Sequence, residues 1–190
     1  MDQPRDATVL VVDDEPEVTD AYALRLRRRY ADVRTAYGGE EALAEMDDDV
    51  DVVLLDRRMP FSGDEVLREL RERGYECRVI MVTAVNPGFE IVDMPFDDYL
   101  CKPTDREDLF AAIDQQLAAA SYDDPVSELF ALTAKLAVLE SEQTPEQLED
   151  SSEYVRMRRR ATELREGLDV PPESFEEMLE EFTAIDRGRK

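Results

Sequence analysis

The stretch Val52-Val53-Leu54-Leu55-Asp56 decides the fold of this chain, because four consecutive apolar residues end directly in a carboxylate. An apolar run without alternation is typical of a strand covered on both faces, as in a parallel sheet with helices above and below it. Asp56 then lies at the carboxyl end of the strand, where open α/β sheets bind their ligands. Taken alone, an aspartate at that position is more often an ordinary turn residue. Its meaning therefore depends on the other strand ends.

The rest of the first 120 residues alternates between short β-branched runs and segments with helical spacing. This alternation predicts a doubly wound, five-stranded parallel sheet, an α/β fold, because parallel neighbours need crossover helices. The predicted strands are Thr8–Val12, Asp32–Ala36, Asp51–Leu55, Arg78–Val82 and Asp98–Cys101, and the predicted helices begin at Pro16, Glu40, Asp64 and, capped by Thr104, at the segment that runs to about Ala120.

Four of these strands end in polar groups, and in a parallel sheet those ends meet at one edge. Strand one leads into Asp13 and Asp14, strand three into Asp56, strand four into Thr83 and strand five into Lys102. Chance turn chemistry rarely produces such a set. We therefore expect these side chains to form one site.

Three carboxylates at one edge repel one another unless a cation lies among them. Mg²⁺ prefers oxygen ligands and is usually held by one or two carboxylates together with phosphate, so the pattern predicts Mg²⁺ bound directly by Asp14 and Asp56, with Asp13 acting through water. An ionised aspartate is also a nucleophile toward phosphoryl groups, and Asp56 is the candidate. Lys102 and Thr83 fit the cation and the hydrogen-bond donor that phosphoryl transfer needs.

The motifs VVDDEP, LLDRRMPFSG, VTA and DYLCKP occur in the order and approximate spacing of the response-regulator receiver domain, which the chain resembles from Thr8 to Ala120. The resemblance implies a flavodoxin-like fold and a phospho-accepting signalling domain of two-component systems, which is not an enzyme beyond slow self-dephosphorylation. It implies a sensor histidine kinase as partner and Asp56 as the phosphoryl acceptor. A metal-dependent aspartyl phosphatase of another fold is the alternative, but it normally has a second aspartate where this chain has Arg58.

The same resemblance assigns roles to further residues. Tyr99 falls at the family's switch aromatic, a role that is favoured over that of a merely packed strand aromatic, and Lys102-Pro103 matches a bond that is often cis. The segment from Asn86 to Phe96 departs from the family, since its prolines leave only a short helix. The other implied roles are metal organisation by Asp13 and Asp14, a metal-binding backbone carbonyl at Arg58, ion pairing with the phosphoryl group by Lys102, and reorientation toward that group by Thr83.

Composition narrows the possible partners of this 190-residue chain. The net charge is −24, from 47 acidic and 23 basic residues, which disfavours unassisted binding to nucleic acid or anionic membranes. With 43% hydrophobic residues the acidity does not predict disorder, and it resembles that of cytoplasmic proteins from halophiles. Two cysteines, no histidine and no long apolar segment predict a cytoplasmic protein without a zinc site, histidine chemistry or a membrane span.

Beyond residue 122 every segment has helical spacing, so we expect domains at 1–122 and 123–190. Asp124 is the predicted N-cap of a first helix, Thr144 begins a capping box for a middle helix, and Val170-Pro171-Pro172 precedes a last helix. Apolar seams predict an antiparallel bundle or pairing with a second copy. The seam residues are Leu129, Leu132, Leu136, Leu139, Tyr154, Met157, Ala161, Leu164, Leu168, Phe175, Met178, Phe182 and Ile185.

An acidic receiver followed by an acidic helical tail resembles haloarchaeal response regulators with a HalX domain. From Asp123 onward there are 18 acidic and 9 basic residues, and the cluster of Arg156, Arg158, Arg159 and Arg160 is the one plausible phosphate contact. No basic recognition helix after a tight turn is visible. A phosphorylation-controlled protein-interaction or dimerisation switch is therefore favoured over a DNA-binding transcription regulator, which stays the alternative.

Overall fold

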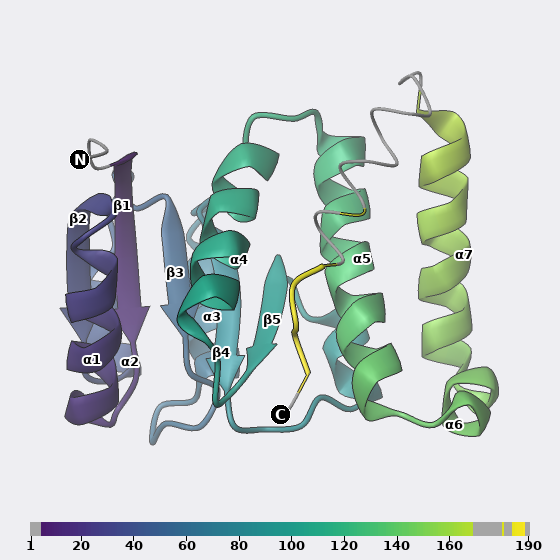
Figure 1. The fold of residues 1–190 in the computed structure, drawn as a ribbon, viewed down its shortest axis with the longest axis horizontal. Coiled ribbons are helices and arrows are strands. Elements are labelled where there is room, and N and C mark those ends of the chain that lie inside the picture. The colour runs from purple at the N-terminus through teal and green to yellow at the C-terminus, as the bar shows by residue number, and fades with distance from the viewer. Residues whose placement is uncertain (1–4, 169–179, 181–183, 189–190) are drawn as a thin grey trace. The chain divides into compact units, whose positions relative to one another are not determined.

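The computed structural model describes residues 5–168, 180 and 184–188 (Figure 1). Its strands form one five-stranded sheet in the order β2-β1-β3-β4-β5, flanked by helices. The predicted α/β fold with a helical C-terminal region is therefore confirmed. The chain divides into two compact units, residues 1–85 and 86–190, and each is described by itself below.

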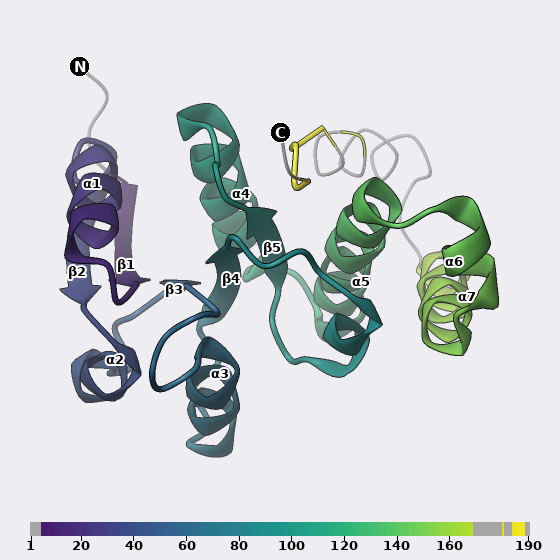
Figure 2. The ribbon, with the colours of Figure 1, turned by 90° about the horizontal axis from the view of Figure 1, so that it is seen from below.

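The first unit contains four strands and three helices, and each predicted element is present to within a few residues. Figure 2 shows α1 on one face of the sheet and α2 and α3 on the other. The apolar strands are consequently covered on both sides, as their unbroken hydrophobic runs require. The elements are β1 (Arg5–Val12), α1 (Pro16–Leu26), β2 (Tyr30–Ala36), α2 (Gly39–Glu45), β3 (Val52–Leu55), α3 (Gly63–Glu72) and β4 (Arg78–Thr83).

The second unit contains one strand, a short 3-10 helix and four α-helices within its described residues. The 3-10 helix η1 lies in the segment where the sequence predicted only a short helix. No helix within the described residues is long and apolar enough to span a bilayer. The elements are η1 (Phe89–Asp93), β5 (Asp98–Cys101), α4 (Arg106–Ala119), α5 (Asp124–Glu142), α6 (Pro145–Asp150) and α7 (Ser152–Gly167).

Two predicted helix caps were wrong by one position. Asp105, not Thr104, is the N-cap of α4, and the Thr104 hydroxyl instead donates to the carbonyl of Cys101. Asp123, not Asp124, is the N-cap of α5. Adjacent polar residues compete for a cap, and backbone geometry rather than residue type decides between them.

The predicted middle helix is two helices. Thr144 does form the predicted capping box, with its hydroxyl accepting from the Gln147 N–H (3.3 Å). The chain then leaves helical geometry at Ser151, whose ψ is 115°, and the Ser151 hydroxyl accepts from the Tyr154 N–H to start α7. A serine side chain that accepts a hydrogen bond from a free N–H group in the first turn of a new helix favours such a break.

The apolar seams meet within one chain. Helices α5 and α7 run antiparallel and in contact (Figure 1), and Leu129, Ala161 and Leu164 share a buried cluster that Leu132, Leu136 and Leu168 border. The predicted antiparallel packing is therefore confirmed for these two helices. Most of the predicted last helix, including Phe175, Met178 and Phe182, lies outside the described residues, although Ile185 is described and buried.

A buried ion pair joins β5 to residues near the C-terminus. The Arg187 guanidinium donates to both carboxylate oxygens of Asp98, at 2.7 and 3.0 Å, and both side chains are at most 1% exposed. Gln116 of α4 also donates to Asp98, and the Cys101 N–H donates to the Arg187 carbonyl (3.0 Å). A carboxylate this deeply buried needs its cation, so the pair ties residue 187 to the strand.

Arg187→Met should lower the free energy of unfolding by about 3 kcal/mol, because it leaves the Asp98 carboxylate buried without its cation. The double variant Asp98→Leu/Arg187→Met should recover most of that loss, since it removes both charges. The measurement is urea-induced unfolding in molar KCl. Arg73→Met is the control, because its pair with Glu69 is exposed and should contribute less than about 1 kcal/mol. An equal loss in Arg187→Met and Arg73→Met would contradict the assignment.

Candidate functional site

The pairing of β1 with β3 places two aspartates beside each other. Val12 is in register with Leu55, so the residues that follow, Asp13 and Asp56, leave the sheet at the same level. The Asp56 N–H donates to the Val12 carbonyl (2.9 Å), which extends the ladder by one bond. Both carboxylates are buried, at 3% and 6% exposure.

The loop after β3 fixes the orientation of Asp56. The Arg58 N–H donates to the Asp56 Oδ2 atom (2.6 Å), and the Gly63 N–H donates to the Arg57 carbonyl (3.1 Å). A side chain at residue 63 would meet the Asp56 carbonyl, because a Cβ atom there would lie 2.2 Å from that oxygen. Glycine is therefore required for this close approach.

Helix α3 anchors the far end of the same loop. Ser62 and Glu65 form a reciprocal capping box, and the hydrogen bonds from Ser62 lower the pKa of Glu65. The Arg57 guanidinium pairs with Asp64 in the first turn, with Nε 2.9 Å from Oδ1. The loop that carries the candidate acceptor is thus held at both ends.

Asp13 is held by the start of α1. Its Oδ1 atom accepts from the Glu15 N–H (3.0 Å), and its carbonyl accepts from the Thr19 hydroxyl (2.9 Å). Thr19 is fully buried. The acidic strand end and the first turns of α1 therefore form one hydrogen-bonded unit.

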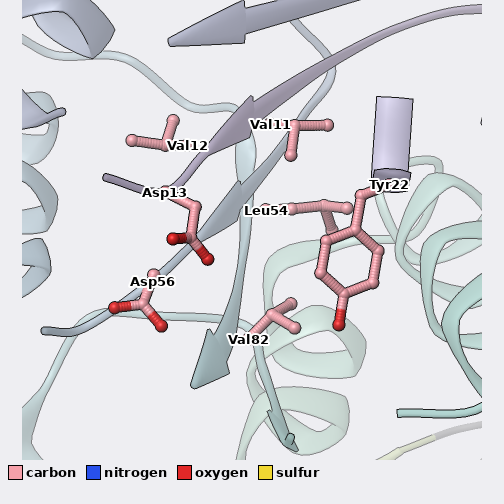
Figure 3. A pocket seen from close by; sticks show the side chains of 7 residues that line it. All are labelled: Val11, Val12, Asp13, Tyr22, Leu54, Asp56 and Val82. Atoms are coloured by element: carbon pink, nitrogen blue, oxygen red, sulfur yellow. The ribbon is translucent and has the colours of Figure 1, made fainter. Parts of the chain in front are cut away.

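The two carboxylates line one small pocket (Figure 3). In this view the Asp13 and Asp56 side chains extend from neighbouring strand ends into the same space, and the Tyr22 ring approaches it from α1. The remaining lining is apolar and comes from Val11, Val12, Leu54 and Val82. The exposed wall of the pocket is thus almost wholly apolar, although two aspartates are among the residues that line it.

The donor set of this pocket suits a hard cation. Two buried carboxylates that share a pocket favour a bound positive charge, and carboxylate oxygens are the ligands that Mg²⁺ prefers. Within the residues that the structure describes, no three His, Cys, Asp or Glu side chains converge on one point. A cation here would therefore complete its shell with water, backbone carbonyl or phosphate oxygens, as Mg²⁺ commonly does.

The other predicted residues of the first unit differ in exposure. Thr83 ends β4 and is fully buried, and its hydroxyl accepts from the Val85 N–H (3.3 Å). Asp14 and Arg58 are exposed, and neither side chain lines the pocket. The structure thus brings Asp13 and Asp56 together in one pocket that Asp14 does not line.

Two predicted residues belong to the second unit. Tyr99 lies within β5 and is fully buried, with its ring centroid 5.7 Å from that of Phe96. Lys102 directly follows β5 and is half-buried, and the Lys102-Pro103 peptide bond is cis, as the resemblance implied. Tyr99 and Lys102 are therefore carried by one strand.

Sequence reasoning missed Thr19 and Tyr22. Both lie in the helix that was predicted to begin at Pro16, and no pattern in the sequence gave either of them a role at the site. A buried threonine facing the carbonyl of an acidic strand end could have been suspected from its place in the first turns of α1, six residues after Asp13. The contribution of Tyr22 to the pocket wall could not be predicted without knowing how α1 packs on the sheet.

Comparison with known protein families explains this arrangement. Residues 9–114 match the response regulator receiver domain, and residues 118–186 match the HalX domain. The chain therefore belongs to the response regulator receiver family and carries a HalX domain after the receiver, as the resemblance implied.

Related proteins in other organisms are regulators by name. A Haloferax volcanii protein, assigned provisionally to the transcriptional regulators, is 49% identical over 139 residues, which are 73% of this chain and 24% of that protein. The transcriptional regulatory protein CutR of Streptomyces coelicolor is 42% identical over 110 residues, 55% of this chain and 51% of CutR. The chain thus spans about a quarter of the length of the Haloferax protein and about half of the length of CutR.

Solved receiver structures share the fold. The response regulator TrrA of Thermotoga maritima, solved in complex with Mg²⁺ and BeF, is 30% identical, has a TM-score of 0.51 and covers 58% of this chain and 98% of its own. A receiver domain from Clostridium thermocellum is 29% identical, has a TM-score of 0.55 and covers 60% of this chain and 96% of its own.

Gly63→Ala should lower the free energy of unfolding by about 1 to 3 kcal/mol, because the added methyl group must displace the Asp56 backbone. Gly167→Ala is the matched control. A Cβ atom at residue 167 meets nothing within 4 Å, and alanine is the better helix former, so this variant should be neutral or slightly stabilised. Thermal unfolding of both variants compares them, and equal stability would refute the close-approach argument.

Proposed function

We propose that this chain is the response regulator of a two-component phosphorelay, which accepts a phosphoryl group on Asp56 and thereby controls its helical C-terminal region. The observation that carries the proposal is the pair of buried carboxylates, Asp13 and Asp56, that share one pocket at the end of a parallel sheet. Membership of the receiver family supports it.

The donor in this proposal is the phosphohistidine of a sensor kinase. An Asp56 carboxylate oxygen attacks phosphorus, an O–P bond forms, and the N–P bond to the kinase imidazole breaks. The Arg58 N–H orients the acceptor by binding its Oδ2 atom. Phosphoryl transfer depends mainly on such positioning and on neutralising charge.

Mg²⁺ is the proposed cofactor, and when bound it would neutralise charge on the phosphoryl oxygens. Asp13 and Asp56 would hold it, together with the Arg58 carbonyl, and Asp14 is the further proposed ligand of the acidic pair. Thr83 and Lys102 would donate to the phosphoryl group, and Tyr99 would respond as the switch aromatic. The self-dephosphorylation of such a domain would be at most slow.

The proposed domain division is a receiver over 1–122 and a HalX output domain over 123–190. Homodimerisation through the helical region is proposed as one form of output. The seam leucines Leu129 and Leu136 already pack toward α7 in the same chain, so a dimer would use other surface. Cytoplasmic location is proposed from the partner, since two-component kinases present phosphohistidine there.

Asp56→Asn should abolish phosphorylation, because an amide oxygen does not form the acyl phosphate. The measurement is phosphoprotein mass after incubation with acetyl phosphate and Mg²⁺ in high salt. The wild type should gain one phosphoryl group that hydroxylamine removes, and so should the control Asp48→Asn, which alters an exposed carboxylate. Labelling that persists in Asp56→Asn would reassign the acceptor.

A transcription regulator is the second candidate, and the names of the Haloferax and Streptomyces relatives favour it. The acidic charge of the helical C-terminal region does not favour it. Within the arginine cluster, Arg156 pairs with Asp93 (3.0 Å), Arg160 pairs with Glu128 (2.8 Å), and Arg159 lies 3.8 Å from Glu163. Arginines that already pair with carboxylates are poor phosphate contacts.

We therefore expect no retention of DNA by the phosphorylated or unphosphorylated chain. A gel-shift assay with fragments of haloarchaeal promoter DNA in molar KCl tests this. Arg158→Gln serves as a probe of the remaining basic charge and should change nothing. Retention that depends on Arg158 would establish the transcription-regulator interpretation instead.

A further inference from the structure

The segment between β4 and β5, residues 86–97, lies in the same compact unit as the HalX helices. Helix α5 contacts β5 and η1, and α7 contacts η1. The compact unit thus begins at Asn86, well before the HalX match at residue 118. The C-terminal helices are packed against receiver elements.

Lys135 is the most unusual residue of this interface. It lies in the middle of α5 and is 6% exposed, and its Nζ atom donates to the carbonyls of Val92 (3.2 Å) and Met94. These carbonyls belong to the end of η1, where a helix leaves acceptors without partners inside the helix. Lys135 therefore supplies donors that the end of η1 needs.

The same ammonium group contacts an aromatic pair. Lys135 Nζ lies 4.7 Å from the centroid of the Phe96 ring, and the Phe96 ring centroid lies 5.7 Å from that of Tyr99. Burial lowers the pKa of Lys135 to about 8, with Asp97 and Asp93 opposing the shift. Since an amine has two N–H donors even when neutral, both carbonyl contacts persist in either charge state.

Two polar contacts surround this core. The Gln143 side chain at the end of α5 donates to the Pro87 carbonyl (2.9 Å), and Arg156 of α7 pairs with Asp93 (3.0 Å). Residues 86–97 are thus held by α5 and α7 at their beginning, middle and end.

We propose that residues 86–97 are the docking surface through which the HalX helices respond to the receiver, with Lys135 as the residue that couples α5 to the Phe96–Tyr99 pair. This inference rests on the proposed function, because phosphorylation is the signal that would be transmitted. The surface is built into the chain, so its partner is α5 with α7 rather than a separate protein. A displacement of the Tyr99 ring would alter its contact with the Phe96 ring, and thereby the contact of the Phe96 ring with the Lys135 ammonium group.

Hydrogen–deuterium exchange of the full chain tests the proposal, with Mg²⁺ and beryllofluoride as the mimic of a bound phosphoryl group. In the wild type, exchange should change in peptides covering 52–63, 86–101 and 124–142. In Lys135→Met the changes at 52–63 and 86–101 should persist, and the change at 124–142 should fall by at least half. Lys135→Arg, which keeps donors and charge, should retain more of the response than Lys135→Met.

A second pair of variants covers the case in which Lys135→Met does not fold. Arg156→Gln removes an exposed contact to residues 86–97, and Arg160→Gln removes another exposed contact, to Glu128 in α5. In the wild type, peptides covering α7, residues 152–167, should also change their exchange, and this change should weaken in Arg156→Gln only. An equal α7 response in both variants would then overturn the docking surface.

The remaining outcomes separate the two proposals. A wild type that responds at 52–63 and 86–101 but not at 124–142 overturns the coupling and leaves the phosphoryl site intact. Equal α5 responses in the wild type and in Lys135→Met remove Lys135 from the coupling. The absence of any response, including at 52–63, overturns the proposed function together with this inference.

Discussion

The in-register pairing of β1 with β3 is the constraint on which the site depends. Because Val12 faces Leu55 across the ladder, the next residue of each strand is an aspartate at the same edge. Shifting either strand by one residue would separate the two aspartates and break the bond from the Asp56 N–H to the Val12 carbonyl. The backbone pairing that fixes the register therefore also holds two like charges together.

Much of this site could be predicted from the sequence, because it depends on patterns that are local. Unbroken apolar runs mark strands buried on both faces, and the residue after each run is placed by topology alone. That reasoning placed Asp13, Asp56 and Thr83 at strand ends without knowledge of side-chain packing. It could not tell that Asp13 is buried and Asp14 exposed, because this difference arises at the turn into α1, where the Glu15 N–H donates to Asp13.

The contacts of the second unit could not be predicted, because they join residues far apart in the chain. Arg187 lies 89 residues from Asp98, and Lys135 lies more than 40 residues from the η1 carbonyls. Local patterns gave no reason to bury either basic residue, since lysine and arginine are mostly exposed. The break at Ser151 was missed for a related reason: the apolar spacing continues through it, and only the backbone reveals two helices.

These buried basic groups bear on how the acidic chain is organised. In a chain with a net charge of −24, burying Lys135 leaves more uncompensated acid outside, whereas Arg187 is buried together with the acid that it neutralises. Such an arrangement is favourable only if the buried cation satisfies something specific, and here Arg187 satisfies Asp98 and Lys135 satisfies the end of η1. Both partners lie between β4 and the end of β5, and Tyr99 and Lys102 belong to or follow that same strand. The HalX region is therefore not joined to the receiver only by a linker: its buried charges complete the packing of the receiver's last strand.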